Sequence, residues 1–168
     1  MSAGSVKFPV QAQPIDITGE WVDYSSLIAG TSINENFYNR QTGTWFEGAD
    51  NPWTMNPETA FGLKVNASGS YVWIIAVQHS VTECVAYSAE HFTGHVTADG
   101  QYLNFVEESW RSKYVNSCAP EENKDFDVQP GQMQLSYEVS KEYDLFLGKE
   151  YVVMTITAGG DAFKLYKR

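Results

Sequence analysis

The chain has 168 residues, of which 43% are hydrophobic and 14% aromatic, and this balance predicts a single globular domain with a sizeable core. Its formal net charge at pH 7 is −10, and Lys and Arg form no visible cluster, so neither nucleic acid nor an anionic membrane surface is an expected partner. No apolar run approaches the roughly 20 residues that a membrane-spanning helix needs, so membrane insertion is not expected.

The first strand is the stretch around which we expect the fold to be organised. Residues 1–14 are predicted to be a tail, or an arm across one end of a barrel, and a single domain is expected over residues 15–168. Strand one is predicted over residues 15–25 and contains Gly19 and Trp21. A large aromatic at this point can plug one end of a small closed sheet, while a glycine lets a neighbouring chain approach it. A plain core tryptophan in a β-sandwich is the alternative.

The segment over residues 26–58 is predicted to be a long loop with one short strand near residues 42–46, because Gly and Pro interrupt it repeatedly. Loops of this length in a compact domain are often lids or binding loops. The segment also carries large rings, which either cover the mouth of a barrel or hold the loop against the surface. These rings are Phe37, Tyr38, Trp45, Phe46 and Trp53.

Strand signals sharpen from residue 59 onwards. A hairpin is predicted from residues 60–65 and 70–78 around a glycine-bearing turn, and its second arm is apolar on both faces, so one face must be covered. The acidic stretch over residues 116–131 is expected to be a surface loop. The remaining predicted strands are 83–93, 101–108 with its continuation or bend at 110–115, 132–139, 149–157 and the C-terminal run.

These elements predict an all-β fold of about eight to ten strands joined mostly by short turns, with no convincing amphipathic helix. The expected architecture is a single antiparallel up-and-down β-barrel, because closing the sheet removes the exposed edges that an open meander would carry. The final strand ends in several cations, and one of them, Lys164, Lys167 or Arg168, is expected on the face of the Trp21 indole.

Groups that could carry chemistry are few. His91 and His95 share strand parity, but four residues along a strand span about 13 Å, so the two rings cannot share an ion and no metal site is predicted. The chain has no Gly-x-Ser-x-Gly elbow and no Gly-rich phosphate loop, and no cofactor is predicted. Cys84, in a strand, and Cys118, in a polar loop, are expected to form a disulfide. That bond would indicate an extracellular or periplasmic protein, whereas free thiols would indicate a cytoplasmic one.

The pattern of the whole chain resembles the calycin superfamily, which includes the lipocalins and the fatty-acid-binding proteins. The resemblance rests on Gly19-x-Trp21 at the start of strand one, on the antiparallel strands that follow, and on the aromatic and basic final strand that ends with Arg168. It covers nearly the whole chain but depends on few fixed residues. It implies a calycin-like barrel in which Gly19, Trp21 and Arg168 have structural roles.

A barrel of about eight strands can hold one small ligand, so the first functional hypothesis is a protein that binds a small hydrophobic molecule in its interior. The second is an enzyme of the natural-product cyclase or isomerase type, since some calycin-like barrels fold a polyene or polyketide substrate; its catalytic residues are not assigned. The third is a structural or interaction domain with a filled core. No oligomeric state is predicted. The residues expected to line a cavity are Tyr71, Trp73, Tyr87, Phe105, Trp110 and Tyr137.

Overall fold

The computed structural model describes residues 16–29, 59–81 and 84–168. The expected N-terminal tail falls outside these residues, as do the five rings predicted either to cover a barrel mouth or to hold the loop against the surface. The elements in chain order are β1 (Gly19–Val22), α1 (Tyr24–Ala29), β2 (Thr59–Val65), β3 (Ser70–Val81), β4 (Cys84–Asp99), β5 (Tyr102–Asn116), the 3-10 turn η1 (Pro120–Glu122), β6 (Lys124–Val128), β7 (Gln132–Asp144), β8 (Lys149–Ala158) and β9 (Asp161–Lys167).

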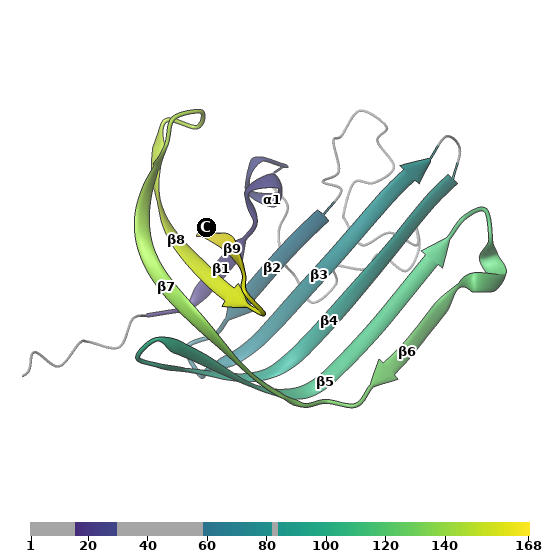
Figure 1. Ribbon diagram of the computed structural model, residues 1–168, viewed down its shortest axis with the longest axis horizontal. Coiled ribbons are helices and arrows are strands. Elements are labelled where there is room, and N and C mark those ends of the chain that lie inside the picture. The colour runs from purple at the N-terminus through teal and green to yellow at the C-terminus, as the bar shows by residue number, and fades with distance from the viewer. Residues whose placement is uncertain (1–15, 30–58, 82–83) are drawn as a thin grey trace, which may run out of the picture.

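Eight of these strands close into an antiparallel barrel in the order β4-β3-β2-β1-β9-β8-β7-β5, and β5 pairs again with β4 (Figure 1). Neighbours in the barrel are mostly neighbours in sequence, so the topology is up-and-down. The all-β barrel predicted from the strand pattern is therefore confirmed. Period-two alternation and glycine-bearing turns were sufficient to indicate it, because a closed meander of hairpins is built almost entirely from local connections.

Strand one is shorter than the predicted residues 15–25, and the short helix α1 follows it. β1 ends at Val22, and Asp23 then redirects the chain. The Asp23 backbone N–H donates to the carbonyl of Phe61 at 3.0 Å, its carboxylate accepts from the Phe61 N–H at 3.0 Å, and its carbonyl accepts from the Leu27 N–H at 2.9 Å. The same residue thus ends the strand and begins a helix that is too short to show a helical period in the sequence.

The expected surface loop over residues 116–131 contains a strand as well. β6 pairs with the far half of β5, with Trp110 opposite Val128, while β7 pairs with the near half, with Val106 opposite Gln132. Both strands follow the same edge of β5 in one continuous register, and Pro130 interrupts them because it has no N–H to give to the ladder. The residues of β6 are nearly all exposed, so no apolar alternation marked this strand in the sequence.

The barrel is closed at one end and flared at the other. Past Ser136, β7 pairs only with β8 among the described strands, and β6 pairs only with β5. Figure 1 shows β7 and β8 diverging from β5 and β6 away from the β4–β5 turn. The wall of the barrel therefore opens between β6 and the outer part of β7.

Trp21 lies at the closed end and is fully buried within the core. Its indole N–H donates to the carbonyl of Ile17 at 2.8 Å, and the Lys167 ammonium lies 5.2 Å from the ring centroid. The cation on the indole is thus Lys167. Lys164 instead pairs with Glu142 at 2.8 Å, and Arg168 lies 3.4 Å from the Glu20 carboxylate.

Gly19 permits this stacking. Its φ is +116°, a conformation that side chains rarely adopt, and a Cβ there would lie 3.0 Å from the Cε of Lys167. A larger residue would therefore strain β1 and push the lysine away from the tryptophan. The weak Gly-x-Trp motif in the sequence corresponds to a physical requirement of the closed end.

Cys84 and Cys118 form the predicted disulfide, with their Cα atoms 5.5 Å apart. The bond joins the first residue of β4 to the segment that follows β5. The ladder between these two strands runs from the pair Ala86–Asn116 to the pair Asp99–Tyr102. The disulfide therefore fixes their outer ends at the flared side of the barrel.

Candidate functional site

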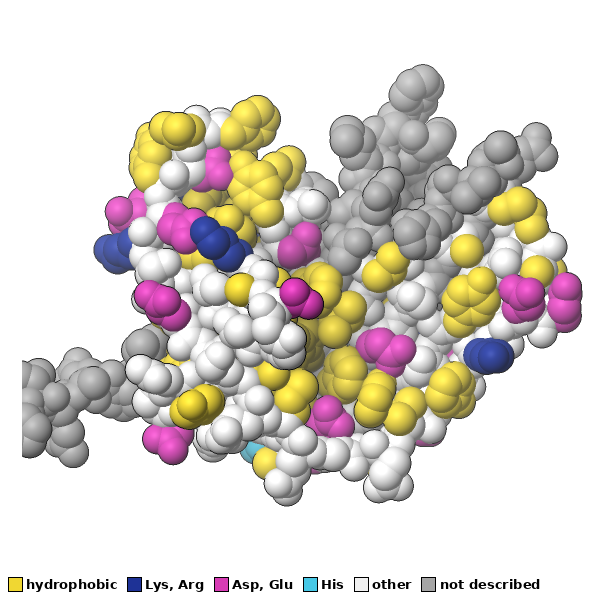
Figure 2. Space-filling view, in the orientation of Figure 1, with side chains coloured by type: hydrophobic (Ala, Val, Ile, Leu, Met, Phe, Trp, Pro, Cys, Tyr) yellow, Lys and Arg dark blue, Asp and Glu magenta, His cyan; other side chains and the backbone are white. Residues whose placement is uncertain are grey.

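A cavity of about 500 Å³ lies between the diverging walls of the barrel. Its walls are predominantly apolar, and Figure 2 shows hydrophobic side chains gathered along the hollow with single acidic groups among them. Six rings line it: Phe61, Tyr71, Trp73, Phe92, Trp110 and Phe163. A cavity of this size and character is in the range of small-molecule binding sites.

Pairing register brings three of these rings into one row. Trp73 of β3 is opposite Phe92 of β4, and Phe92 is opposite Trp110 of β5. The ring centroids are 6.5 Å apart for the first pair and 5.2 Å for the second, in tilted arrangements. Because opposite residues on adjacent strands face the same side of a sheet, the row forms one aromatic wall across three strands.

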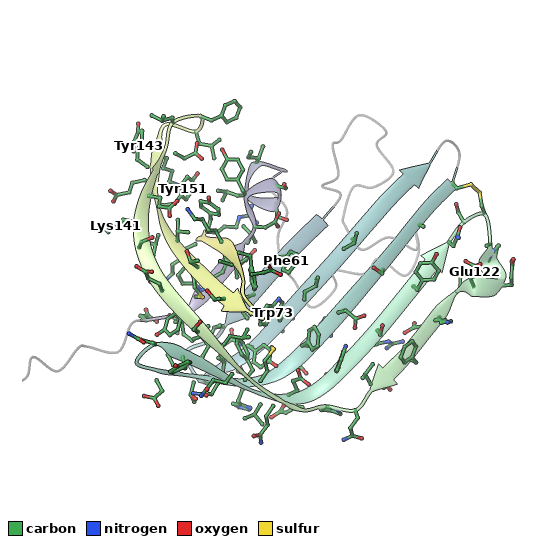
Figure 3. The ribbon with its side chains drawn as sticks, viewed as in Figure 1. Phe61, Trp73, Glu122, Lys141, Tyr143 and Tyr151 are labelled. Carbon is green, nitrogen blue, oxygen red and sulfur yellow. A yellow bond between two sulfur atoms is a disulfide. The ribbon has the colours of Figure 1, made fainter. Side chains whose placement is uncertain are left out.

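Phe163 of β9 faces this wall from the other side of the barrel. Its ring centroid lies 5.5 Å from that of Phe61 and 6.4 Å from that of Trp73. Phe61 and Trp73, both labelled in Figure 3, come from the neighbouring strands β2 and β3 and both approach Phe163. All three rings line the cavity, and Phe61 and Phe163 pack against the core cluster that contains Trp73.

A β-bulge in β5 decides which side chains of that strand reach the cavity. Thr93 is opposite Ser109 but its neighbour Gly94 is opposite Glu107, so Glu108 is the extra residue. In a regular strand Glu107 and Trp110 would point to opposite faces. The bulge places both on the cavity wall.

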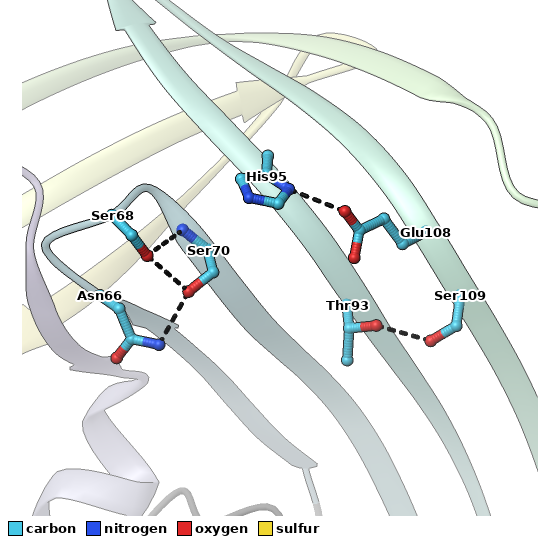
Figure 4. A network of polar contacts seen from close by, with 7 residues as sticks. All are labelled: Asn66, Ser68, Ser70, Thr93, His95, Glu108 and Ser109. Carbon is cyan, nitrogen blue, oxygen red and sulfur yellow. Dashed lines mark hydrogen bonds and ion pairs between the residues drawn. The ribbon is translucent and has the colours of Figure 1, made fainter.

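The bulge requires a glycine on the partner strand. A Cβ at Gly94 would overlap the Val106 carbonyl oxygen and lie 3.0 Å from the Cα of Glu107. On the outer face, Thr93 and Ser109 share a hydrogen bond of 2.7 Å (Figure 4).

His95 and the extra residue itself form a second outer contact. Nδ1 of His95 lies 2.9 Å from the Glu108 carboxylate (Figure 4). The bulge is therefore held by a close backbone approach together with two side-chain contacts on the outer face.

One end of the cavity is polar. The Glu107 carboxylate accepts a hydrogen bond from the Gly131 N–H at 2.7 Å, and the Glu107 N–H donates to the Gly131 carbonyl at 3.0 Å. Burial raises the pKa of the Tyr71 hydroxyl far above its ordinary value, and the neighbouring charges of Glu107 and Glu108 act in the same direction. Tyr71 therefore stays protonated and presents a neutral hydroxyl beside a carboxylate.

A second carboxylate, that of Glu90, is already engaged. It accepts hydrogen bonds from Trp110 Nε1 at 2.5 Å and from Ser112 Oγ at 2.7 Å, one on each oxygen. These bonds fix the plane of the Trp110 ring. Trp73 Nε1, in contrast, is buried and has no hydrogen-bond partner in the part of the chain that the structure describes.

Of the six residues predicted to line a cavity, Tyr71, Trp73 and Trp110 do so. Phe105 is buried in the core, with its centroid 5.0 Å from that of Tyr71 and 5.1 Å from that of Trp73. Tyr137 is also a core residue rather than a lining one, and burial raises the pKa of its hydroxyl. Tyr87 lies in β4, but its side chain is outside the described set.

The predicted set of lining residues left out Phe61, Phe92, Phe163 and Glu107. A signal existed for Phe61, since the turn between β2 and β3 sets a register in which Phe61 is opposite Ile75 on the face of Trp73. No such signal existed for Phe92 or Phe163, because their positions depend on pairing between strands. Glu107 shares the inward face of Leu103 and Phe105 by alternation, whereas Trp110 reaches that face only through the bulge.

Comparisons of the chain with protein-family models, with curated proteins and with solved structures find no match. Within the described ranges, no group of three or more His, Cys, Asp and Glu side chains is placed to hold a metal ion. None of the helices in that same part of the chain combines the length and the apolar character needed to cross a membrane. The shape and lining of the cavity therefore carry the functional interpretation.

Proposed function

We propose that the protein binds a small apolar ligand in the interior of its barrel. The observation that supports this most directly is the cavity of about 500 Å³ with its wall of rings at the flared end. Rings provide a large apolar contact area with little loss of side-chain freedom, which favours binding. Burial of an apolar ligand there should give a negative heat-capacity change.

We also propose a place for the protein among the calycins. The closed eight-strand meander supports this, as does the Trp21 plug under Lys167 beside Gly19. The disulfide supports an oxidising compartment such as the periplasm or the extracellular space.

The proposal is tested by titrating the protein with Nile red, a neutral dye that fluoresces in apolar surroundings. Saturable binding of one dye per chain is expected. Trp110→Ala should weaken dye binding about tenfold, because the ring is part of the cavity wall. The ring is only partly buried, so the variant should still fold. The matched control is Tyr102→Ala, which removes an exposed ring from the same strand and should leave the affinity unchanged. Absence of saturable binding would favour the structural-domain hypothesis instead.

A cavity enzyme of the cyclase or isomerase type is the second candidate, and the Glu107 carboxylate is the observation that favours it. A carboxylate beside a protonated tyrosine can move a proton within an apolar site. Turnover of a polyene or polyketide probe that is lost in Glu107→Gln would support this candidate, whereas tight binding without turnover would favour the carrier.

A further inference from the structure

The polar end of the cavity carries a negative charge. Among the lining residues that the structure describes, Glu107 alone is formally charged, and the remaining polar side chains, Tyr71, Gln129 and Gln132, are neutral. No Lys or Arg stands among those described lining residues. A ligand that enters head first therefore meets a carboxylate that no cation among the described lining residues compensates.

Glu107 has a carboxylate oxygen that can accept a hydrogen bond from a ligand, whereas both oxygens of Glu90 are already used. Both oxygens of Glu90 already accept hydrogen bonds from protein groups. Glu107 uses Oε2 for the Gly131 N–H, and no described residue donates to its Oε1. A carboxylate with an open lone pair, fixed by a backbone donor, is an acceptor for a cationic or hydroxylic headgroup.

From these observations we infer that the cavity selects amphiphiles with a cationic, hydrogen-bond-donating headgroup, such as long-chain primary amines, over fatty-acid anions. The inference rests on the proposed function and adds the class of ligand. An ammonium beside Glu107 would form a charge-assisted hydrogen bond while its alkyl chain lies along the rings of Trp73, Phe92 and Phe163. A fatty-acid carboxylate in the same place would lose its water and meet a like charge.

The test is displacement of Nile red at neutral pH by three ligands of equal chain length: dodecylamine, dodecanol and dodecanoate. The amine should displace the dye at the lowest concentration and dodecanoate at the highest, with the amine favoured over dodecanoate roughly tenfold or more. Glu107→Gln removes the charge but keeps an acceptor for the Gly131 N–H, so it should abolish the preference for the amine. Glu138→Gln, at an exposed position on β7 away from the cavity, should keep the wild-type order.

Wild-type protein provides an independent measurement if Glu107→Gln does not fold. Added salt screens charge–charge interactions, so the advantage of the amine over dodecanol should shrink as ionic strength rises. Equal or tighter binding of dodecanoate, or an amine preference that survives Glu107→Gln, would overturn the inference. Saturable dye binding that none of the three ligands displaces would also overturn it and leave the proposed function standing. Failure of the dye itself to bind would overturn both.

Discussion

Single residues at the bulge determine the character of the cavity. Gly94 lets β5 approach β4 closely, and the extra residue Glu108 fits between Glu107 and Ser109. As a result Glu107 and Trp110, an acid and a ring, share one wall. A change at position 94 would thus alter the site without touching a ligand.

Gly94→Ala should destabilise the fold by about 1–3 kcal/mol or more, because the added methyl would overlap backbone atoms that cannot move aside as a flexible side chain can. Gly131→Ala is the matched control, since its Cβ would meet only the Glu107 carboxylate oxygen at 3.7 Å. Urea unfolding measures both variants. Equal stability of Gly94→Ala and wild type would mean that the bulge is not held by this contact.

At the scale of elements, the turn between β7 and β8 is joined to α1. Asp144 accepts a hydrogen bond from the Leu147 N–H at 2.7 Å, and its carboxylate also accepts from the Tyr24 hydroxyl. These bonds lower the pKa of Asp144, with the Leu147 N–H as the largest cause. One carboxylate thus orders the turn and links it to the helix that follows β1.

The lowered pKa predicts how stability depends on pH. An unfolded Asp has a pKa of about 3.9, and the pKa of Asp144 in the folded protein is lower. The stabilising contribution of Asp144 is therefore complete above the unfolded pKa, and it is lost as the pH falls through the folded pKa. Asp144→Asn should therefore be less stable than wild type near neutrality, and the difference should vanish in acid. Urea unfolding at several pH values measures this difference, with Asp161→Asn at the start of β9 as control. A difference in stability that does not change with pH would show that the Asp144 carboxylate does not stabilise the fold through its charge.

The molecule as a whole separates stability from binding along the barrel. Its closed end holds Trp21 and a continuous core that includes Leu63, Leu103, Met154 and Leu165. Its flared end holds the cavity, where β6 and the outer part of β7 have no partner strand between them among the described elements. A fold arranged in this way can keep an open site because the other end supplies the packing.

Trp21→Ala should cost about 3–5 kcal/mol of stability, as expected for a fully buried aromatic that leaves a large void. Trp110→Ala should cost clearly less, because its ring is only partly buried, yet it should be the variant that loses dye affinity. Thermal unfolding and Nile red titration on the two variants measure the contrast. Equal loss of stability in both would contradict the division between the two ends.

About half of the cavity was predictable from the sequence. Tyr71 and Trp73 were found because residues two apart on an apolar strand share a face. Phe105 was expected in the cavity and is instead packed behind these two rings, since parity gives the face of a side chain but not its height along the barrel. Phe92 and Phe163 depend on which strands meet and in which register.

The sequence alone determined the class of fold, and it predicted a buried Trp21 and named the one pair of cysteines that could form a disulfide. Alternating side chains, glycine-bearing turns such as Asp99-Gly100, and the aromatic beside Gly19 are local signals, and local backbone preferences are sufficient to define hairpins. The tertiary structure alone decided the bulge at Glu108, the break at Pro130 and the cation that lies on Trp21. Each of these depends on contacts between residues far apart in sequence, where close approach of two backbones, rather than the preference of either segment, sets the geometry.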